Sequence, residues 1–139
     1  MTAKVKRIQE KMPTGAFCGE ASIAFVYMLS YLTNKDAKYL EYTKLQCEIL
    51  SKVFAEDKDY DVIAGNAGVI LVLLCAYKLT SDRQYIEWAK KARDILLLSA
   101  TEYEWGMGWM NPVTKTALTG FAYGASGIML ALAKLVYIT

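Results

Sequence analysis

The feature that most limits what this chain can fold into is an internal repeat. The segment NKDAKYLEYTKLQCEIL (34–50) aligns with TSDRQYIEWAKKARDIL (80–96) when the sequence is shifted by 46 residues, and Gly19 then falls on Gly65. A period of this length is typical of chains that stack copies of one supersecondary unit. Six aligned pairs within the two segments are identical: Asp36 and Asp82, Tyr39 and Tyr85, Glu41 and Glu87, Lys44 and Lys90, Ile49 and Ile95, and Leu50 and Leu96.

Each unit contains two kinds of segment. A largely uncharged segment opened by small residues comes first (18–32 and 64–79), and a charged segment with apolar residues at helical spacing follows. The pattern predicts a helical hairpin in each unit, with an inner apolar helix and an outer amphipathic helix. YGASGIMLALAKL (123–135) begins a third unit, and a short N-terminal segment around residues 5–11 precedes the first. The expected fold class is therefore all-α.

The third unit begins later than the period requires, since Gly124 lies 59 residues after Gly65. The additional residues belong to the segment TEYEWGMGWMNPVTKTA (101–117), whose glycines, tryptophans and Asn-Pro pair are typical of a shaped connection between elements.

Glycine opens each inner segment, at Gly19, Gly65 and Gly124. Because glycine costs a helix about 1 kcal/mol relative to alanine, its recurrence needs a structural reason. We expect the inner helices to converge at one end, where a side chain on these glycines would collide with a neighbouring helix. Converging N-termini would also gather free N–H groups and suit an anionic ligand. The alternative is that small residues only permit close helix crossing.

Composition argues against several classes of function. The chain has 16 basic and 14 acidic residues, a balance unlike that of a nucleic-acid-binding protein. The uncharged stretch between Lys115 and Lys134 contains glycine, threonine and serine, so we expect a core helix there and no membrane span. Cys18, Cys47 and Cys75 form no C-x-x-C pair, which predicts reduced, packed thiols and a cytoplasmic location. The absence of histidine removes the commonest general base and zinc ligand.

Three stretches, taken in order, resemble a known family. They are TGAFCGEASIAFVYMLSYLTNK (14–35), YDVIAGNAGVILVLLCAYKLT (60–80) and GWMNPVTKTALTGFAYGASGIMLALAKL (108–135). They are similar to the first three repeats of the LanC-like cyclase domain of class II lanthipeptide synthetases, the LanM type. The resemblance implies one truncated cyclase region over 1–139, with repeats at about 14–54, 60–100 and 118–139. It also implies a partial α/α toroid, in which an outer ring of helices wraps an inner ring.

The resemblance also implies a reaction. In this family a peptide cysteine thiolate, held on zinc, adds to a dehydroalanine or dehydrobutyrine and closes a thioether ring. Zinc deprotonates the thiol at neutral pH, and a nearby acid must protonate the resulting enolate. The aspartate of D-V-I-x-G, which is Asp61 here, is an active-site residue by the family pattern. The same carboxylate is also suited to cap the N-terminus of the following helix, and the two roles are compatible.

Two departures from the family pattern bear on activity. The usual histidine of G-F-x-H-G is replaced by Tyr123, whose phenol, with an ordinary pKa near 10, cannot shuttle protons near neutrality. The alternative for Tyr123 is that it simply fills space. The zinc ligands of the family, two cysteines and a histidine, belong to later repeats. We therefore expect no metal or other cofactor in this chain and zinc in a full-length parent, and we interpret Cys18, Cys47 and Cys75 as core thiols.

The long connection is rich in aromatic residues. Trp105 and Trp109, with Tyr103, are suited either to line a substrate-binding groove or to fill the wedge between hairpins. Glu102 and Glu104 are not interpreted as a catalytic pair, because nothing in the sequence defines their separation.

The resemblance thus implies a region of a lanthionine-forming cyclase whose partner is a dehydrated precursor peptide, and we expect that this chain does not close rings alone. The alternative is a non-catalytic, peptide-binding module of the same fold. An unrelated α/α-barrel enzyme, such as a glycosidase, would need paired carboxylates, and only Asp61 is well placed. The third inner helix, from Gly124 to Val136, has almost no polar face, so we expect a homo-oligomer. The side chains expected near its contact are Ile128, Leu132 and Leu135.

Overall fold

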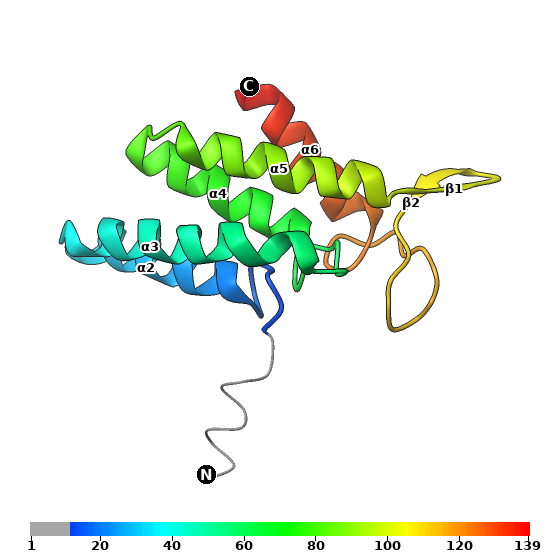
Figure 1. The fold of residues 1–139 in the computed structure, drawn as a ribbon, viewed down its shortest axis with the longest axis horizontal. Coiled ribbons are helices and arrows are strands. Elements are labelled where there is room, and N and C mark those ends of the chain that lie inside the picture. Colours follow the sequence, from blue (N-terminus) through cyan, green and yellow to red (C-terminus); the bar gives the residue numbers. More distant parts are fainter. Residues whose placement is uncertain (1–11) are drawn as a thin grey trace, which may run out of the picture.

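A computed structural model describes residues 12–139, and the short segment expected around residues 5–11 lies outside them. Two helical hairpins and a further helix make up most of this part of the chain (Figure 1). The first hairpin pairs α2 (Glu20–Asn34) with α3 (Lys38–Val53), which continues into the 3-10 turn η1 (Phe54–Glu56). The second pairs α4 (Asn66–Thr80) with α5 (Gln84–Ser99), and α6 (Ala125–Ile138) follows the long connection. The predicted all-α fold class is confirmed.

The helix boundaries follow the sequence repeat. Helices α4 and α5 begin and end 46 residues after α2 and α3, as Glu20 and Asn66 show for the first pair of boundaries. Both inner helices end at a residue in the left-handed conformation, Lys35 with φ 56° and Ser81 with φ 58°. The N–H group of each bonds back to a carbonyl of the last turn, which satisfies an otherwise unpaired helix end.

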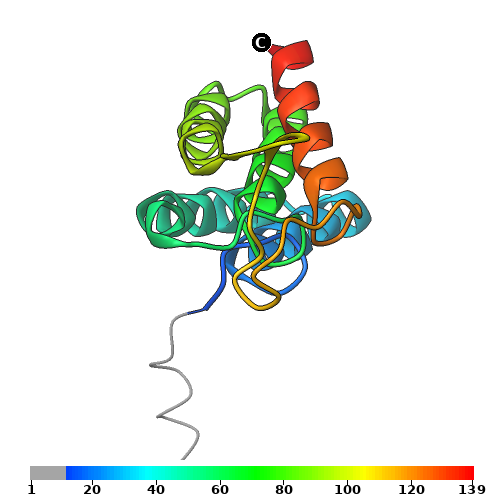
Figure 2. The same cartoon turned by 90° about the vertical axis from the view of Figure 1, so that its right-hand side faces the viewer.

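The helices form two layers. Figure 2 shows α3 and α5 on one side of the molecule and α2, α4 and α6 on the other. Helix α4 packs between α2 and α6 and is buried on most of its surface, whereas α3 and α5 bury a single stripe. This arrangement agrees with the predicted division into inner and outer helices. The buried residues of α4 are Asn66, Ala67, Gly68, Val69, Ile70, Val72, Leu73, Leu74 and Ala76.

The same turn precedes α2, α4 and α6, at residues 15–19, 61–65 and 120–124. In each case the first N–H group of the helix donates to a carbonyl oxygen seven residues earlier in the chain. The expectation of free N–H groups at converging helix ends is therefore wrong, because the preceding turn occupies them. The three bonds join Glu20 to Pro13 (2.9 Å), Asn66 to Asp59 (3.1 Å) and Ala125 to Leu118 (2.9 Å).

The opening glycines are explained by the same turns. A Cβ atom on Gly65 would lie 2.1 Å from the main-chain oxygen of Asp59, and one on Gly124 would lie 2.4 Å from that of Leu118. The predicted collision with a neighbouring helix is wrong for these positions, because the obstacle is the residue's own preceding turn. Close approach between units occurs instead at Gly68, where a Cβ would lie 2.5 Å from the main-chain nitrogen of Ala16.

Main-chain hydrogen bonds connect the three turns directly. The first turn donates to the second through N–H groups of residues 14–18, and the second donates to the third through Ile63, whose nitrogen lies 3.4 Å from the oxygen of Ala122. The carboxylate of Asp57 adds a side-chain link, because it accepts bonds from both the main-chain nitrogen (2.9 Å) and the hydroxyl of Thr14. The position of each turn therefore depends on its neighbour.

The long connection contains a small antiparallel hairpin that the sequence reasoning missed. Strands β1 (Thr101–Tyr103) and β2 (Gly106–Gly108) pair there, and Gly106 turns the chain with φ 129°, a conformation that favours glycine. Beyond it, the side chain of Asn111 accepts bonds from two nearby main-chain nitrogens and closes the Asn-Pro turn. The helices of residues 12–139 are all too short or too polar to cross a membrane.

The prediction that Ile128, Leu132 and Leu135 lie near a contact between copies is wrong. Ile128 and Leu135 are buried, with 1% and 0% exposure, because α6 packs this face against α4 and α5. Leu132 is half-buried against the same core. The apolar side chains that α6 exposes lie elsewhere on the helix: Met129, Leu130, Val136 and Tyr137.

Candidate functional site

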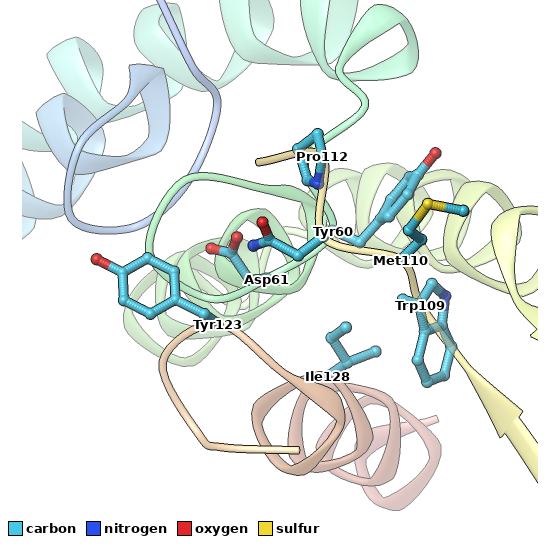
Figure 3. A pocket seen from close by; sticks show the side chains of 8 residues that line it. Tyr60, Asp61, Trp109, Met110, Pro112, Tyr123 and Ile128 are labelled. Atoms are coloured by element: carbon cyan, nitrogen blue, oxygen red, sulfur yellow. The ribbon is translucent and has the colours of Figure 1, made fainter. Parts of the chain in front are cut away.

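A small pocket, with a volume of about 10 Å3, lies where the turns of the second and third units meet the long connection (Figure 3). It brings together Asp61, Trp109 and Tyr123, three of the four site residues predicted from sequence, whereas Trp105 does not line it. The lining residues come from three separate segments: Tyr60 and Asp61, then Trp109, Met110, Asn111 and Pro112, then Tyr123 and Ile128.

Asp61 is held in the pocket wall by its own turn. It is only 5% exposed, and its Oδ1 accepts a hydrogen bond from the main-chain nitrogen of Ala64 at 2.7 Å. The N-cap of α4 is Gly65, which makes no side-chain cap. The interpretation of Asp61 as the helix cap is therefore wrong, since its carboxylate closes the turn that precedes the helix.

The environment of Asp61 favours retention of a proton. Burial raises the pKa of its carboxyl group above the ordinary value, and the negative charge of Asp57 raises it further. Main-chain hydrogen bonds, foremost that from Ala64, favour the charged form and offset part of the increase. A carboxyl group with a raised pKa beside an open pocket is suited to donate and accept protons closer to neutral pH than an exposed aspartate.

Cys18 lies near the same acidic groups. It is exposed, so its interpretation as a core thiol is wrong, and its Sγ lies 3.5 Å from the main-chain oxygen of Ile63. Partial burial raises the pKa of this thiol, and Asp61, Asp59 and Asp57 raise it further. Because the thiolate is the reactive and metal-binding form, the surroundings do not prepare Cys18 for either role.

Tyr123 forms one wall of the pocket. It is 54% exposed, so the alternative that it fills space in the core does not describe it. In Figure 3 its hydroxyl group points away from the carboxylate of Asp61, and the ring lies between that hydroxyl and the pocket. The ring therefore forms the wall of the pocket, and the hydroxyl group lies outside it.

The two tryptophans have different environments. Trp109 is 7% exposed, and its indole nitrogen donates to the main-chain oxygen of Leu96 at 2.7 Å, which supports the packing interpretation. Trp105 is 63% exposed at the end of the β hairpin and stacks on Tyr103, with ring centroids 4.8 Å apart. An exposed, pre-oriented aromatic pair is suited to contact a partner.

Sequence reasoning missed several lining residues. Tyr60 precedes Asp61 and could have been named with it, whereas Met110 and Pro112 enter the pocket only because the loop folds back towards the second unit. That return depends on the turn closed by Asn111, for which the Asn-Pro pair was the available signal.

The zinc site implied by the resemblance does not fit these residues. Within residues 12–139, no three side chains of the metal-binding types lie close enough together to hold an ion. The three cysteines occupy separate places, with Cys18 in the first turn, Cys47 in α3 and Cys75 in α4. Cys47 is buried, which confirms its interpretation as a core thiol, but Cys75 is exposed and its interpretation as a core thiol is wrong. Since the chain also lacks histidine, we assign no step to a metal held by the described residues.

Comparison with known families identifies a match over nearly the whole chain. A family model described as lanthionine synthetase C-like protein matches residues 2–139. The match includes both hairpins, the long connection, α6, and the turns that carry Asp61 and Tyr123. None of the curated proteins compared with the chain matches it.

Proposed function

Because the chain belongs to the lanthionine synthetase C-like family, we propose that it forms the peptide-binding part of a thioether-forming cyclase region. Its partner in this proposal is a dehydrated lanthipeptide precursor. The observation that carries the proposal is the pocket that joins Asp61 and Tyr123, which come from successive turns, beneath the long connection.

The proposal extends to the type of synthetase and the arrangement of units. The motifs D-V-I-x-G-x-A-G and L-T-G-F-x-x-G-A-S-G support a class II, LanM-type cyclase. The common turn before α2, α4 and α6 supports three successive repeats of an α/α toroid, at about 14–54, 60–100 and 118–139. The free thiols of all three cysteines support a cytoplasmic location.

Each pocket residue has a role in the proposal. The exposed side chain of Met110, with Pro112, offers an apolar surface to a peptide segment, and the exposed ring of Trp105 offers a separate aromatic contact at the end of the hairpin. Asp61, whose raised pKa favours the protonated form, is suited to deliver a proton to the enolate formed when a thiolate adds to a dehydroamino acid. Tyr123 offers the face of its ring as the wall against which the substrate lies.

Ring closure in the family also uses zinc, which supplies a thiolate at neutral pH by binding the peptide cysteine. Because residues 12–139 do not assemble a ligand set, we propose that this chain binds the peptide without closing rings. Ligands supplied from other residues would then complete the reaction.

A non-catalytic module is the second candidate, and the replacement of the usual histidine by Tyr123 favours it. Such a module would hold or present the peptide through the same pocket. We also propose self-association through the flank of α6 that carries Met129 and Val136, since both side chains are apolar and exposed.

The test uses a synthetic peptide that contains one cysteine and one dehydroalanine. Ring closure leaves the mass of the peptide unchanged but consumes its thiol. The peptide recovered after incubation with the chain is therefore alkylated, and its mass is measured by mass spectrometry. We expect the chain to bind the peptide without consuming the peptide thiol. All of the recovered peptide should then be alkylated, as in a control without protein. Loss of alkylation would show that the chain is itself a cyclase, and absence of binding would contradict the proposal.

A further inference from the structure

A second hollow lies between the C-terminal halves of α4 and α6, at the opposite end of these helices from the Asp61 pocket. Its volume is about 380 Å3, within the range of about 300–1,000 Å3 that small-ligand pockets occupy. Most of its lining is apolar, with a small number of polar groups, which is the usual composition of such pockets. The lining includes Leu74, Cys75, Lys78, Lys134, Tyr137 and Ile138.

The charges at this hollow have one sign. Lys78 comes from α4 and Lys134 from α6, and neither ammonium group forms an ion pair with a residue in the described part of the chain. No acidic side chain lines the hollow. Burial raises the pKa of Cys75, but both lysines lower it, so the positive potential of each reaches the floor of the hollow.

The apolar floor continues beyond the two lysines. Cys75 and Lys78 also line an adjoining hollow between α4 and α2, whose walls include Phe25, Leu29 and Leu32. Leu29 and Leu32 are each 46% exposed, so apolar surface remains open to solvent along this side of the inner layer. A cationic rim beside a continuous apolar trough is complementary to a molecule with an anionic head and a hydrocarbon chain.

We propose that this hollow binds a single-chain anionic amphiphile. The head group lies between the ammonium groups of Lys78 and Lys134, and the chain packs along Leu74, Tyr137 and Ile138. The long methylene stems of the lysines can pack on the chain while their charges remain at the head group. This proposal does not depend on peptide binding at Asp61, because the two sites share no lining residue.

Calorimetric titrations below the critical micelle concentration test the proposal. Laurate and dodecyl phosphate are the probes, which distinguish a carboxylate from a phosphate head group, and dodecanol and dodecyltrimethylammonium are the controls. We expect saturable binding of at least one anion, weaker binding of dodecanol, and none of the cation. Equal binding of all four amphiphiles, or no binding of either anion, would overturn the proposal.

Variants identify the groups responsible. Lys78→Gln and Lys134→Gln should each weaken binding of the anion about threefold to fivefold and leave dodecanol unchanged, because a partly solvated charge contact is modest. Lys91→Gln, on the exposed side of α5, is the matched control and should change neither. Tyr137→Ser should weaken binding of the anion and binding of dodecanol to the same extent. Because Tyr137 is 92% exposed, the substitution should leave the fold intact. Anion affinity unchanged in both lysine variants would contradict the assignment.

Cys75 reports the location of the ligand directly. Bound amphiphile should slow alkylation of Cys75, which lies on the floor, and leave alkylation of the exposed Cys18 at the other end unchanged. Equal rates at Cys75 with and without saturating ligand would show that the amphiphile binds elsewhere and would overturn the proposal.

Discussion

The indole nitrogen of Trp109 donates a hydrogen bond to the main-chain oxygen of Leu96, 2.7 Å away, and so ties the long connection to the last turn of α5. The bond satisfies a carbonyl that the helix itself leaves unpaired near its end. Trp105, four residues earlier, has no such anchor and is mostly exposed. One tryptophan therefore holds the loop in place while the other is available to a partner.

Substitution of the two tryptophans should separate stability from binding. Trp109→Ala should lower the free energy of unfolding by about 3–5 kcal/mol, because a buried ring and its hydrogen bond are lost. Trp105→Ala should change it by less than about 0.5 kcal/mol and should instead weaken peptide binding. Urea denaturation and peptide titration measure the two effects. Equal destabilisation by both variants would show that the hairpin tip is also part of the scaffold.

Alanine substitutions at the turn glycines test why glycine is required before the inner helices. Gly124→Ala and Gly65→Ala should each cost about 1–3 kcal/mol, because the new methyl group meets the main chain of the preceding turn. Gly120→Ala is the matched control, since nothing lies within 4 Å of its added Cβ. Thermal unfolding of the three variants measures the difference, and similar melting temperatures for Gly120→Ala and Gly124→Ala would refute the explanation.

Asp61→Asn should keep the turn and change the pH dependence of stability. The amide oxygen can still accept the bond from Ala64. Because the pKa of Asp61 is higher in the folded state than its ordinary value of 3.8, the wild-type protein loses stability as pH rises from there through the folded pKa. The variant lacks this contribution and should be at least as stable as wild type at neutral pH.

Urea midpoints at a series of acidic to neutral pH values measure this effect. Asp59 contributes with the same sign, because burial and the neighbouring carboxylates raise its pKa, so the variant should keep part of the slope. A variant that loses more stability than wild type as pH rises would contradict the sign of the assigned shift.

The three thiols should differ in reactivity. Cys47 is fully buried, and burial raises its pKa to about 12, so it should resist alkylation until the protein unfolds. Cys18 and Cys75 are exposed and should react in the native state, slowly because the pKa of each is raised. Mass spectrometry of alkylated protein counts the modified thiols with and without denaturant. Native modification of Cys47 would show that α3 opens easily.

The repeat in the sequence predicted much of the fold, because a helical hairpin and its copy must bury equivalent apolar positions. The boundaries of α4 and α5 follow those of α2 and α3 without a shift. The sequence pattern could not predict why residue 65 is glycine. A Cβ atom there would lie 2.1 Å from the main-chain oxygen of Asp59, and only the folded turn brings these two positions together. The buried face of α6 was also missed, because a helix with so few polar side chains gives little indication of which side meets the core.

The sequence predicted only part of the candidate site, because the rest depends on tertiary contacts. Asp61 and Tyr123 came from motifs, but their place in one pocket depends on main-chain bonds between successive turns, which the sequence does not encode in any single motif. The contribution of Met110 depends on the path of the long connection, which tertiary contacts determine. Cys18 was misplaced because an apolar segment with few charges does not reveal which of its residues begin the exposed turn.

The most direct test of the account is an NMR titration of the isotopically labelled chain with the peptide that contains cysteine and dehydroalanine. If the Asp61 pocket binds the peptide, amide signals of residues 61–65, 109–111 and 120–124 will shift together and saturate, and the shifts will weaken in the Trp105→Ala variant. Signals of α3, on the opposite layer, serve as the internal control. Saturable shifts confined to α3 and α5, or no shifts at all, would contradict the account.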